Sequence, residues 1–244
     1  MHATTKALLD ARAHKTPVPL SKFAELTPSR DGALAVQREV AADLGEVGAW
    51  KVAVTPDGEA LFAPIFTPTI KEDGAVFSEG SEKPIGVEIE LAFRLCKDLP
   101  VLPEKDEDLI AAIDGLYAVI ELIDSRLEDM NQASLDLKLA DYLSNAGFIV
   151  GEKIETWDPY ALTTVDLKLV VNDETVIDGS VTNVLGAPLD LLKGAVKAAG
   201  DHCGGFKAGQ YVTTGSLSVC VFYPAGSKVT AKYPALKAAV SATL

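Results

Sequence analysis

The sequence is poor in residues on which several common chemistries depend. Its histidines and cysteines number three each: His2, His14, His202, Cys96, Cys203 and Cys220. So few histidines argue against a mechanism based on a histidine-activated nucleophile. The cysteines, odd in number and at unrelated spacings, fit reduced core thiols better than a disulfide framework or a zinc site.

Long apolar runs and an excess of positive charge are also missing. The apolar runs are short and interrupted, so we expect no membrane span. The first residues lack the continuous apolar core of a signal peptide, and a cytoplasmic protein is therefore the expectation. The net charge is −13, from 22 basic and 35 acidic residues, which argues against nucleic-acid binding. An anionic small molecule remains compatible, because the local charge at a metal can be opposite to the global one.

The 244 residues, 48% of them hydrophobic, suffice for one large domain, or for a large domain with a small helical lobe. Helical periodicity over 3–14 and 32–44 predicts an N-terminal helical lobe at 1–48. A β-rich catalytic domain is expected over 49–244, and the two parts could form one continuous domain. We expect strands at 50–55, 75–77, 85–95, 117–124, 148–151, 164–171, 211–214, 217–223 and 228–232, and helices at 104–114, 131–143 and 189–200. This mixture predicts an α+β fold rather than a regular alternation.

Three acidic residues are embedded in apolar strand sequence. Glu88 and Glu90 project from one face of a strand, because successive side chains alternate. Glu121 is flanked closely by apolar residues on both sides. A solvated strand face is one explanation for the first two, but an unpaired glutamate in a buried strand is costly. Three neighbouring carboxylates would need a cation, and oxygen ligands favour Mg²⁺ or Mn²⁺ over zinc.

The order and spacing of short motifs along nearly the whole chain give a further indication. These motifs are Ala35-Val36-Gln37, Trp50-Lys51-Val52, Gly86 to Phe93, Lys97 to Pro100, Ile120 to Arg126, Leu139-Ala140-Asp141, Gly147 to Gly151, Gly186-Ala187-Pro188, Lys207-Ala208-Gly209 and Thr214 to Leu217. Together they resemble the fumarylacetoacetate hydrolase superfamily, in its 2-keto-4-pentenoate hydratase and 2-oxo-3-hexenedioate decarboxylase branch. The resemblance implies a mixed β-roll or sandwich with a small helical lobe.

The same resemblance implies a function and a metal site. Mg²⁺ or Mn²⁺ would be held by Glu88, Glu90 and Glu121, and the substrate would be a short 2-oxo or 2-hydroxydienoic acid from aromatic ring cleavage. An α-keto acid can chelate such an ion, which stabilises an enolate. A hydratase is the first expectation; a decarboxylase or a C–C hydrolase is the alternative, and the protein is expected to form a homo-oligomer. A hydratase–decarboxylase partnership is left open.

Further site residues follow from the resemblance. Lys51 is the candidate for proton transfer, with a pKa lowered by desolvation, although a strand lysine can simply point into water. Ser216 and Ser144 are candidates for substrate binding; a tight turn equally explains Ser216. Asp124 and Arg126 could pair and orient the metal ligands, although a surface ion pair is the commoner meaning of this spacing.

Two segments depart from the hydratases of this branch. The segment Ala63 to Ile70 lacks the acidic residue that those enzymes usually carry. Tyr142 and Leu143 are bulkier than the residues expected there and predict a reshaped pocket. The missing acid motivates a second hypothesis, in which the chain is a binding or accessory subunit that keeps the fold without catalysis.

Overall fold

The computed structural model describes residues 1–23, 28–77 and 83–244 of the chain. Its α-helices are α1 (Ala3–His14), α2 (Arg30–Leu44), α3 (Asp106–Ile110), α4 (Leu135–Ala140) and α5 (Pro188–Ala199). Short 3₁₀ turns are η1 (Leu20–Phe23), η2 (Thr67–Thr69), η3 (Tyr142–Ser144) and η4 (His202–Gly204). Within these described ranges, no helix has the length and apolarity needed to span a membrane.

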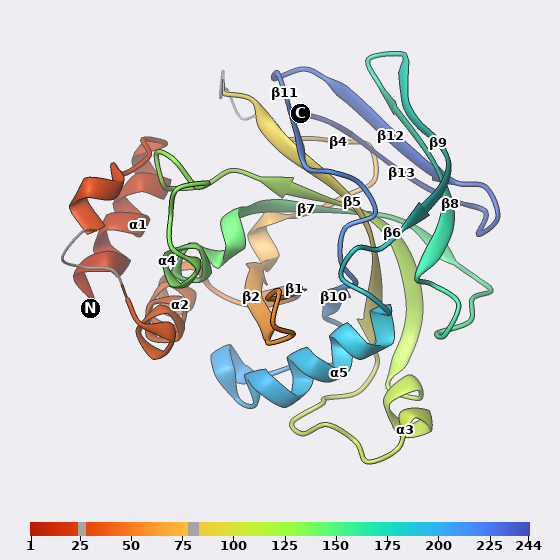
Figure 1. Cartoon of the computed structure of the whole chain (residues 1–244), viewed down its shortest axis with the longest axis horizontal. Helices are drawn as coiled ribbons and strands as arrows, with labels where there is room; N and C mark the ends of the chain where they lie inside the picture. Colours follow the sequence, from red (N-terminus) through yellow and green to blue (C-terminus); the bar gives the residue numbers. More distant parts are fainter. Residues whose placement is uncertain (24–27, 78–82) are drawn as a thin grey trace.

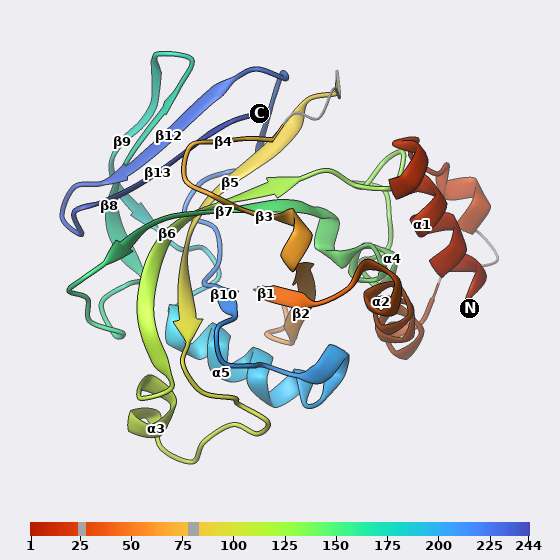
Figure 2. The same ribbon diagram turned by 180° about the vertical axis from the view of Figure 1, so that it is seen from behind.

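The strands form two sheets (Figure 1). Their bounds are β1 (Val47–Val54), β2 (Ala60–Phe66), β3 (Ile70–Glu72), β4 (Ala75–Val76), β5 (Ile85–Leu95), β6 (Ile113–Ile123), β7 (Asn145–Ile154), β8 (Thr164–Val171), β9 (Glu174–Thr182), β10 (Tyr211–Thr213), β11 (Val221–Tyr223), β12 (Lys228–Tyr233) and β13 (Ala238–Thr243). The larger sheet runs β2-β1-β10-β5-β6-β7-β3, with β11 paired to β5. The smaller sheet runs β4-β13-β12-β8-β9. Figure 2 shows β3 beside β7 on the reverse side.

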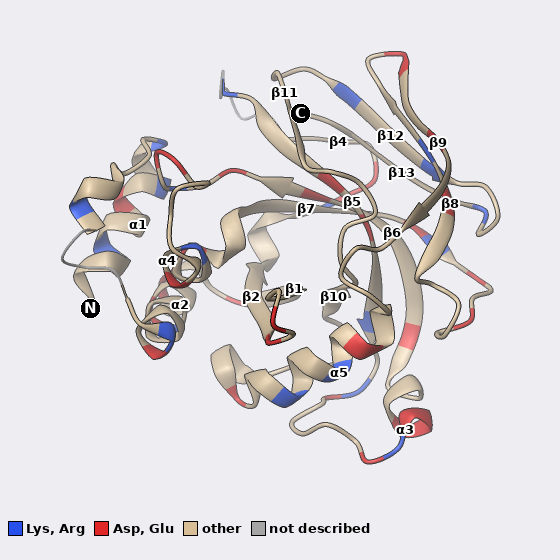
Figure 3. Ribbon diagram, in the orientation of Figure 1, with Lys and Arg blue, Asp and Glu red and all other residues tan. Residues whose placement is uncertain are grey.

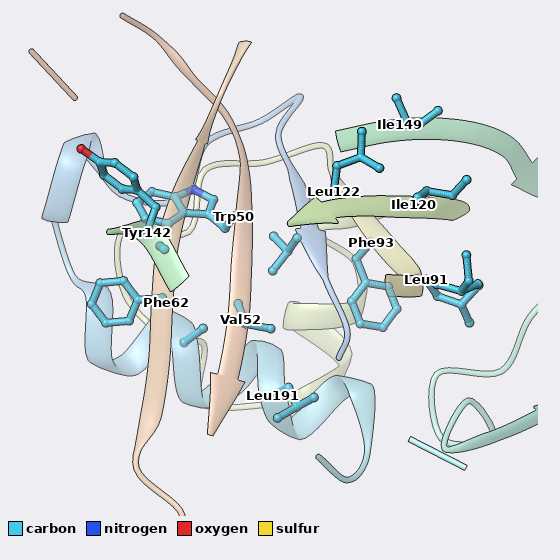
Figure 4. Close-up of a cluster of buried hydrophobic side chains, with 14 of the residues drawn as sticks. Trp50, Val52, Phe62, Leu91, Phe93, Ile120, Leu122, Tyr142, Ile149 and Leu191 are labelled. Carbon is cyan, nitrogen blue, oxygen red and sulfur yellow. The ribbon is translucent and has the colours of Figure 1, made fainter. Parts of the chain in front are cut away.

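The larger sheet has two unlike faces. One face carries most of the core, including Trp50, Leu91 and Ile120, all nearly inaccessible to solvent. Helix α5 packs against β1 and β2 on this face, and the smaller sheet covers β6 and β7 through β13. Figure 4 shows these side chains along the strands, with Trp50 and Val52 on the side of α5 and Leu91 and Ile120 farther from it. Non-polar burial of this extent is the main stabilising contribution to such a fold.

The opposite face of the same sheet carries a smaller apolar cluster and the acidic residues. The cluster consists of Ala49, Ile65, Ala92, Val119 and Phe148, all fully buried. Side chains two residues apart in a strand lie on the same face of the sheet. Lys51, Glu90 and Glu121 are each two residues from a member of this cluster, and they therefore lie on its face. The sheet therefore encloses polar groups directly beside an apolar patch.

Several predicted elements are confirmed, including the helices at the N-terminus, α5, and the strands β5 and β8. The helix predicted at 104–114 is wrong at its end, because β6 begins at Ile113. The helix predicted at 131–143 is also too long: α4 begins after its N-cap Ser134, and Tyr142 already has a positive φ. Strands β2, β3, β9 and β13 were not predicted. Pro64 is compatible with β2 because that strand is a sheet edge, where a missing N–H costs no ladder bond.

The N-terminal helices do not have a core of their own. Leu8 and Val36 belong to the same continuous buried cluster as Trp50. Helix α2 packs on α4 and on β2. Ser29 caps α2 by accepting a hydrogen bond from the Gly32 N–H at 3.3 Å. These contacts fix the helices against the edge of the larger sheet.

Candidate metal centre

The three glutamates singled out by the sequence lie together in the structure. Glu88 and Glu121 are direct partners across the antiparallel pair β5–β6. Glu90 follows two residues after Glu88 on the same face, and one carboxylate oxygen from each residue lies within 4.8 Å of the others. Glu121 is completely buried and Glu90 is 2% exposed. Two buried carboxylates and a third beside them form a strongly negative site.

Lys51 reaches this cluster from β1. Its Nζ lies 3.0 Å from Glu88 Oε2 and 3.0 Å from Glu121 Oε1. Its side chain is only 12% exposed, so the lysine does not point into water. The lysine thus provides the positive charge nearest to the three carboxylates.

The backbone around β5 holds the glutamates in place. The Gly215 N–H donates to Glu90 Oε2 at 3.0 Å, and the Tyr233 hydroxyl donates to the Glu90 carbonyl at 2.8 Å. Gly215 has φ +89°, and a Cβ there would lie 2.8 Å from Asn183 Oδ1, so only glycine fits. On the other strand, Asn145 Nδ2 donates to Glu121 Oε1 at 2.9 Å.

The charges of this cluster shift one another's pKa values. Burial, followed by repulsion from Glu121 and Glu88, raises the pKa of Glu90 well above its ordinary value. Burial also raises the pKa of Glu121, against the opposing effect of Lys51. For Lys51, burial lowers the pKa, but the attraction of Glu121, Glu88 and Glu90 outweighs it and the net shift is upward. The lowered pKa expected for Lys51 from the sequence is therefore wrong for the site without a bound cation.

The donor set fits a hard divalent cation. Glu121 Oε2 is buried and has no hydrogen-bond partner. Burying an unpaired carboxylate oxygen destabilises the fold unless a cation binds it. Among the residues described, this is the cluster of three or more acidic, histidine or cysteine side chains that could hold a metal. All its ligand atoms are carboxylate oxygens, the type that Mg²⁺ and Mn²⁺ prefer.

A cavity of about 200 Å³ opens beside Lys51 and Glu88. The other side chains in its wall are Ile123, Met130, Asn131, Lys138, Leu143, Ser144 and Cys220. Its size suits a short organic acid, since drug-sized ligands occupy cavities of roughly 300 Å³ or more. A larger open hollow of about 1030 Å³ is lined by Gly48, Val150 and Tyr211, and none of the three glutamates reaches it.

The wall of the small cavity contains unusual backbone. Tyr142, Leu143 and Ser144 have φ values of 52°, 51° and 63°, a left-handed conformation that costs roughly 1–2 kcal/mol for each such residue. Leu143 and Ser144 line the cavity, so Ser144 lies within reach of a ligand there, and its role in substrate binding stays a prediction. Tyr142 instead lies in the core, edge-on to Phe66.

The other predicted site residues lie elsewhere. The Ser216 hydroxyl donates to the Ser218 carbonyl at 2.7 Å, so it supports the loop between β10 and β11, and Ser216 is absent from the cavity wall described above. Arg126 donates to the Asp124 backbone carbonyl at 2.7 Å. Its carboxylate partner is Asp141 and not Asp124, which corrects the predicted pair.

The pair Arg126–Asp141 is buried and fully hydrogen-bonded. Arg126 Nε donates to Asp141 Oδ1, and the Ser125 hydroxyl donates to Asp141 Oδ2 at 2.7 Å. Arg126 also donates to the Asn145 carbonyl at 2.6 Å. Because Asp141 immediately precedes the left-handed turn and Asn145 follows it, this pair fixes both ends of the cavity wall.

Among the residues at this site that sequence reasoning missed are Asn145, Met130, Asn131 and Lys138. Asn145 carries a detectable signal, because an amide at the start of an apolar strand needs a partner. Met130, Asn131 and Lys138 belong to a loop and a short helix whose position depends on the tertiary fold. No pattern in the sequence places them beside β5.

Comparison with known proteins adds to these observations. No family model matches the chain. A 4-oxalocrotonate decarboxylase from Pseudomonas putida is 30% identical over 132 residues, 53% of this chain and 48% of that protein. A 2-keto-4-pentenoate hydratase from Dechloromonas aromatica is 29% identical over 168 residues, 68% of this chain and 63% of that protein. The matches thus span about half to two thirds of these relatives.

Solved structures extend the likeness to the whole fold. The 4-oxalocrotonate decarboxylase from Pseudomonas putida G7, complexed with magnesium and adipate, superimposes with a TM-score of 0.82 at 22% identity, covering 99% of this chain and 95% of that one. A fumarylacetoacetate hydrolase family protein from Yersinia pestis superimposes with a TM-score of 0.56 at 15% identity, covering 80% of this chain and 91% of that one.

The fold is therefore that of the fumarylacetoacetate hydrolase superfamily, a curled mixed sheet with few helices. The sequence relatives named above support a relationship to the branch of that superfamily that contains 2-keto-4-pentenoate hydratases and 4-oxalocrotonate decarboxylases.

Proposed function

We propose that this chain is a divalent-metal-dependent lyase acting on a short 2-oxo or 2-hydroxydienoic acid, by addition of water or by loss of CO₂. The observation that carries the proposal is the position of Glu88, Glu90 and Glu121 beside Lys51, at the end of a small cavity. The related hydratases and decarboxylases support the reaction class.

Each residue has a proposed role. Glu88, Glu90 and Glu121 hold Mg²⁺ or Mn²⁺ through carboxylate oxygens. The bound ion supplies a Lewis acid that polarises the 2-oxo group and stabilises negative charge there. Asn145 and the Gly215 N–H orient two of the carboxylates.

Lys51 is proposed to transfer a proton or to hold the substrate carboxylate. A cation bound by Glu88 and Glu121 would weaken their hold on the lysine, because the same carboxylate charges would then be shared. Lys51 Nζ would become free to turn towards a ligand in the cavity that it lines. Ser144, in the same wall, can donate a hydrogen bond to that ligand.

The missing acid distinguishes the two reactions. Lys51 pairs across β1–β2 with Ala63, and Glu88 is the one carboxylate in the cavity wall described above. Hydration needs a group that activates water besides the metal ligands, whereas decarboxylation needs only charge stabilisation and one protonation. This observation favours decarboxylation as the second candidate beside the hydratase expected from the sequence.

Assays with matched substrates test the proposal. Metal-stripped protein is given 2-hydroxypenta-2,4-dienoate or 2-oxo-3-hexenedioate, with and without Mg²⁺ or Mn²⁺. Loss of diene absorbance without gas identifies hydration, and release of CO₂ identifies decarboxylation. Glu121→Gln should abolish either reaction, and Glu155→Gln, an exposed control, should not. Tight metal binding without turnover of either acid would instead support the accessory subunit.

A further inference from the structure

Lys138 is a second lysine in the wall of the metal-site cavity. It is contributed by α4, where it is the basic residue of the last turn, and Figure 3 shows the basic segment on that short helix. Lys138 is half-buried, and Asn131 of the preceding loop lines the same cavity. The cavity therefore has a lysine from β1 and another from α4.

The two lysines differ in their electrostatic surroundings. Lys51 is held between Glu88 and Glu121, each at 3.0 Å. Lys138, by contrast, has no carboxylate within ion-pair distance in the part of the chain that the structure describes. The acid nearest to it in sequence, Asp136, is paired with Arg30 at 2.8 Å. The positive charge of Lys138 is thus available to a ligand.

The charge of the chain makes this arrangement significant. The protein carries a net charge of −13, and the metal end of the cavity holds three carboxylates. A cation at that end can neutralise one acidic group of a ligand, but a second carboxylate on the ligand would be repelled. A half-buried lysine on another wall reduces the repulsion of that second carboxylate, because local positive charge attracts anions even on an acidic protein.

We propose that Lys138 binds the second carboxylate of a dicarboxylic substrate, so that the site selects short 2-oxo dicarboxylic acids over their monocarboxylic analogues. This inference rests on the proposed function, in which the 2-oxo acid end of the ligand lies at the metal. In hydration, Lys138 then determines specificity without contacting the reacting atoms, whereas in decarboxylation the carboxylate that it binds is the group lost as CO₂. The competing explanation, a lysine that complements the C-terminal end of α4, predicts no such selection.

The matched ligands are 2-oxoadipate and 2-oxohexanoate, which have the same six-carbon chain and differ in a terminal carboxylate or methyl group. Calorimetric titration into the Mg²⁺-loaded protein should show at least tenfold tighter binding of 2-oxoadipate, a difference of about 1.4 kcal/mol. In Lys138→Met and Lys138→Gln this ratio should fall to near one, with 2-oxohexanoate affinity unchanged. Lys138→Arg should keep the preference, and Lys138→Glu should reverse it.

Two controls separate the possible failures. Lys197→Met removes one charge from an exposed position on α5 and should leave the ratio as in the wild type. Oxalate needs only the metal, so its binding reports on the proposed function alone. If oxalate fails to bind the metal-loaded protein, the proposed function is wrong. If oxalate binds but the wild type does not distinguish the two six-carbon acids, or Lys138→Met still does, the role of Lys138 is wrong.

Discussion

Glu88 and Glu121 face each other across the β5–β6 pair, and Lys51 Nζ lies 3.0 Å from a carboxylate oxygen of each. Two glutamates at opposed positions would repel, because like charges directly across a sheet destabilise it. The lysine offsets this repulsion only in part, since burial still raises the pKa of Glu121 and its Oε2 has no partner. The sheet therefore carries a local electrostatic cost that a divalent cation would relieve.

Metal binding should follow from this relationship. We expect Mg²⁺ or Mn²⁺ to bind the wild type at one site and to raise its melting temperature, with about 2.7 kcal/mol of added stability when the free ion is at 100 times Kd. The double variant Glu88→Gln, Glu121→Gln should lose both effects. Calorimetric titration and thermal melts of EDTA-stripped protein measure them. Equal metal affinity in the double variant would contradict the proposed ligands.

Lys51→Met should separate two roles of the lysine. If Lys51 transfers a proton, kcat should fall by about 10²- to 10⁴-fold while metal affinity is retained. If it only attracts the substrate carboxylate, KM should rise with kcat nearly unchanged. Steady-state kinetics on the substrate found in the assays above distinguish these results. Wild-type values of both constants would remove Lys51 from the reaction.

The sequence predicted the metal cluster better than the cavity around it. Glu88 and Glu90 are separated by one residue in a strand, so their common face follows from local geometry. Glu121 lies beside Glu88 because of the register between β6 and β5. That register cannot be predicted from the local sequence. Lys138 and Asn131 reach the cavity only because α2 and the sheet edge position α4, and such long-range packing has no local signal.

The strands likewise differ in how well the local sequence predicts them. Strands with alternating or continuous apolar residues, such as β5 and β8, were predicted with the correct bounds. Strand β13 has the sequence Ala-Ala-Val-Ser-Ala-Thr, which has little intrinsic β preference. It is nevertheless extended because it pairs with β12 and β4. Tertiary pairing outweighs local propensity there.

Arg126→Met should destabilise the protein strongly. It leaves the buried Asp141 carboxylate without its cation and frees the carbonyls of Asp124 and Asn145. Breaking a buried pair typically costs about 3–5 kcal/mol. Urea unfolding measures this loss. The control Lys168→Met breaks an exposed pair with Asp178 and should cost less than about 1 kcal/mol. A similar small loss for both variants would show that Asp141 has another partner.

The stability of the protein should fall as the pH falls from about 6.5 to about 4, in part because of His202. Its ring is buried between two partners: Nε2 donates to Gln37 Oε1 at 2.9 Å, and Nδ1 accepts from Arg38 at 3.0 Å. Burial, followed by the charge of Arg38, lowers the pKa of His202 to about 4, against the opposing charge of Asp201.

The sign follows from proton binding. Between the two pKa values the unfolded chain takes up a proton on His202 and the folded chain does not, so stability is full above about pH 6.5 and declines below it. With partial solvent screening, His202 should account for about 2 kcal/mol of that decline. Urea unfolding of the wild type and His202→Gln between pH 4 and 7.5 tests this, since the variant keeps a hydrogen-bonding side chain but cannot titrate. The variant should be less stable at pH 7.5 and show a shallower decline. Parallel pH profiles for the two proteins would assign the decline to other groups.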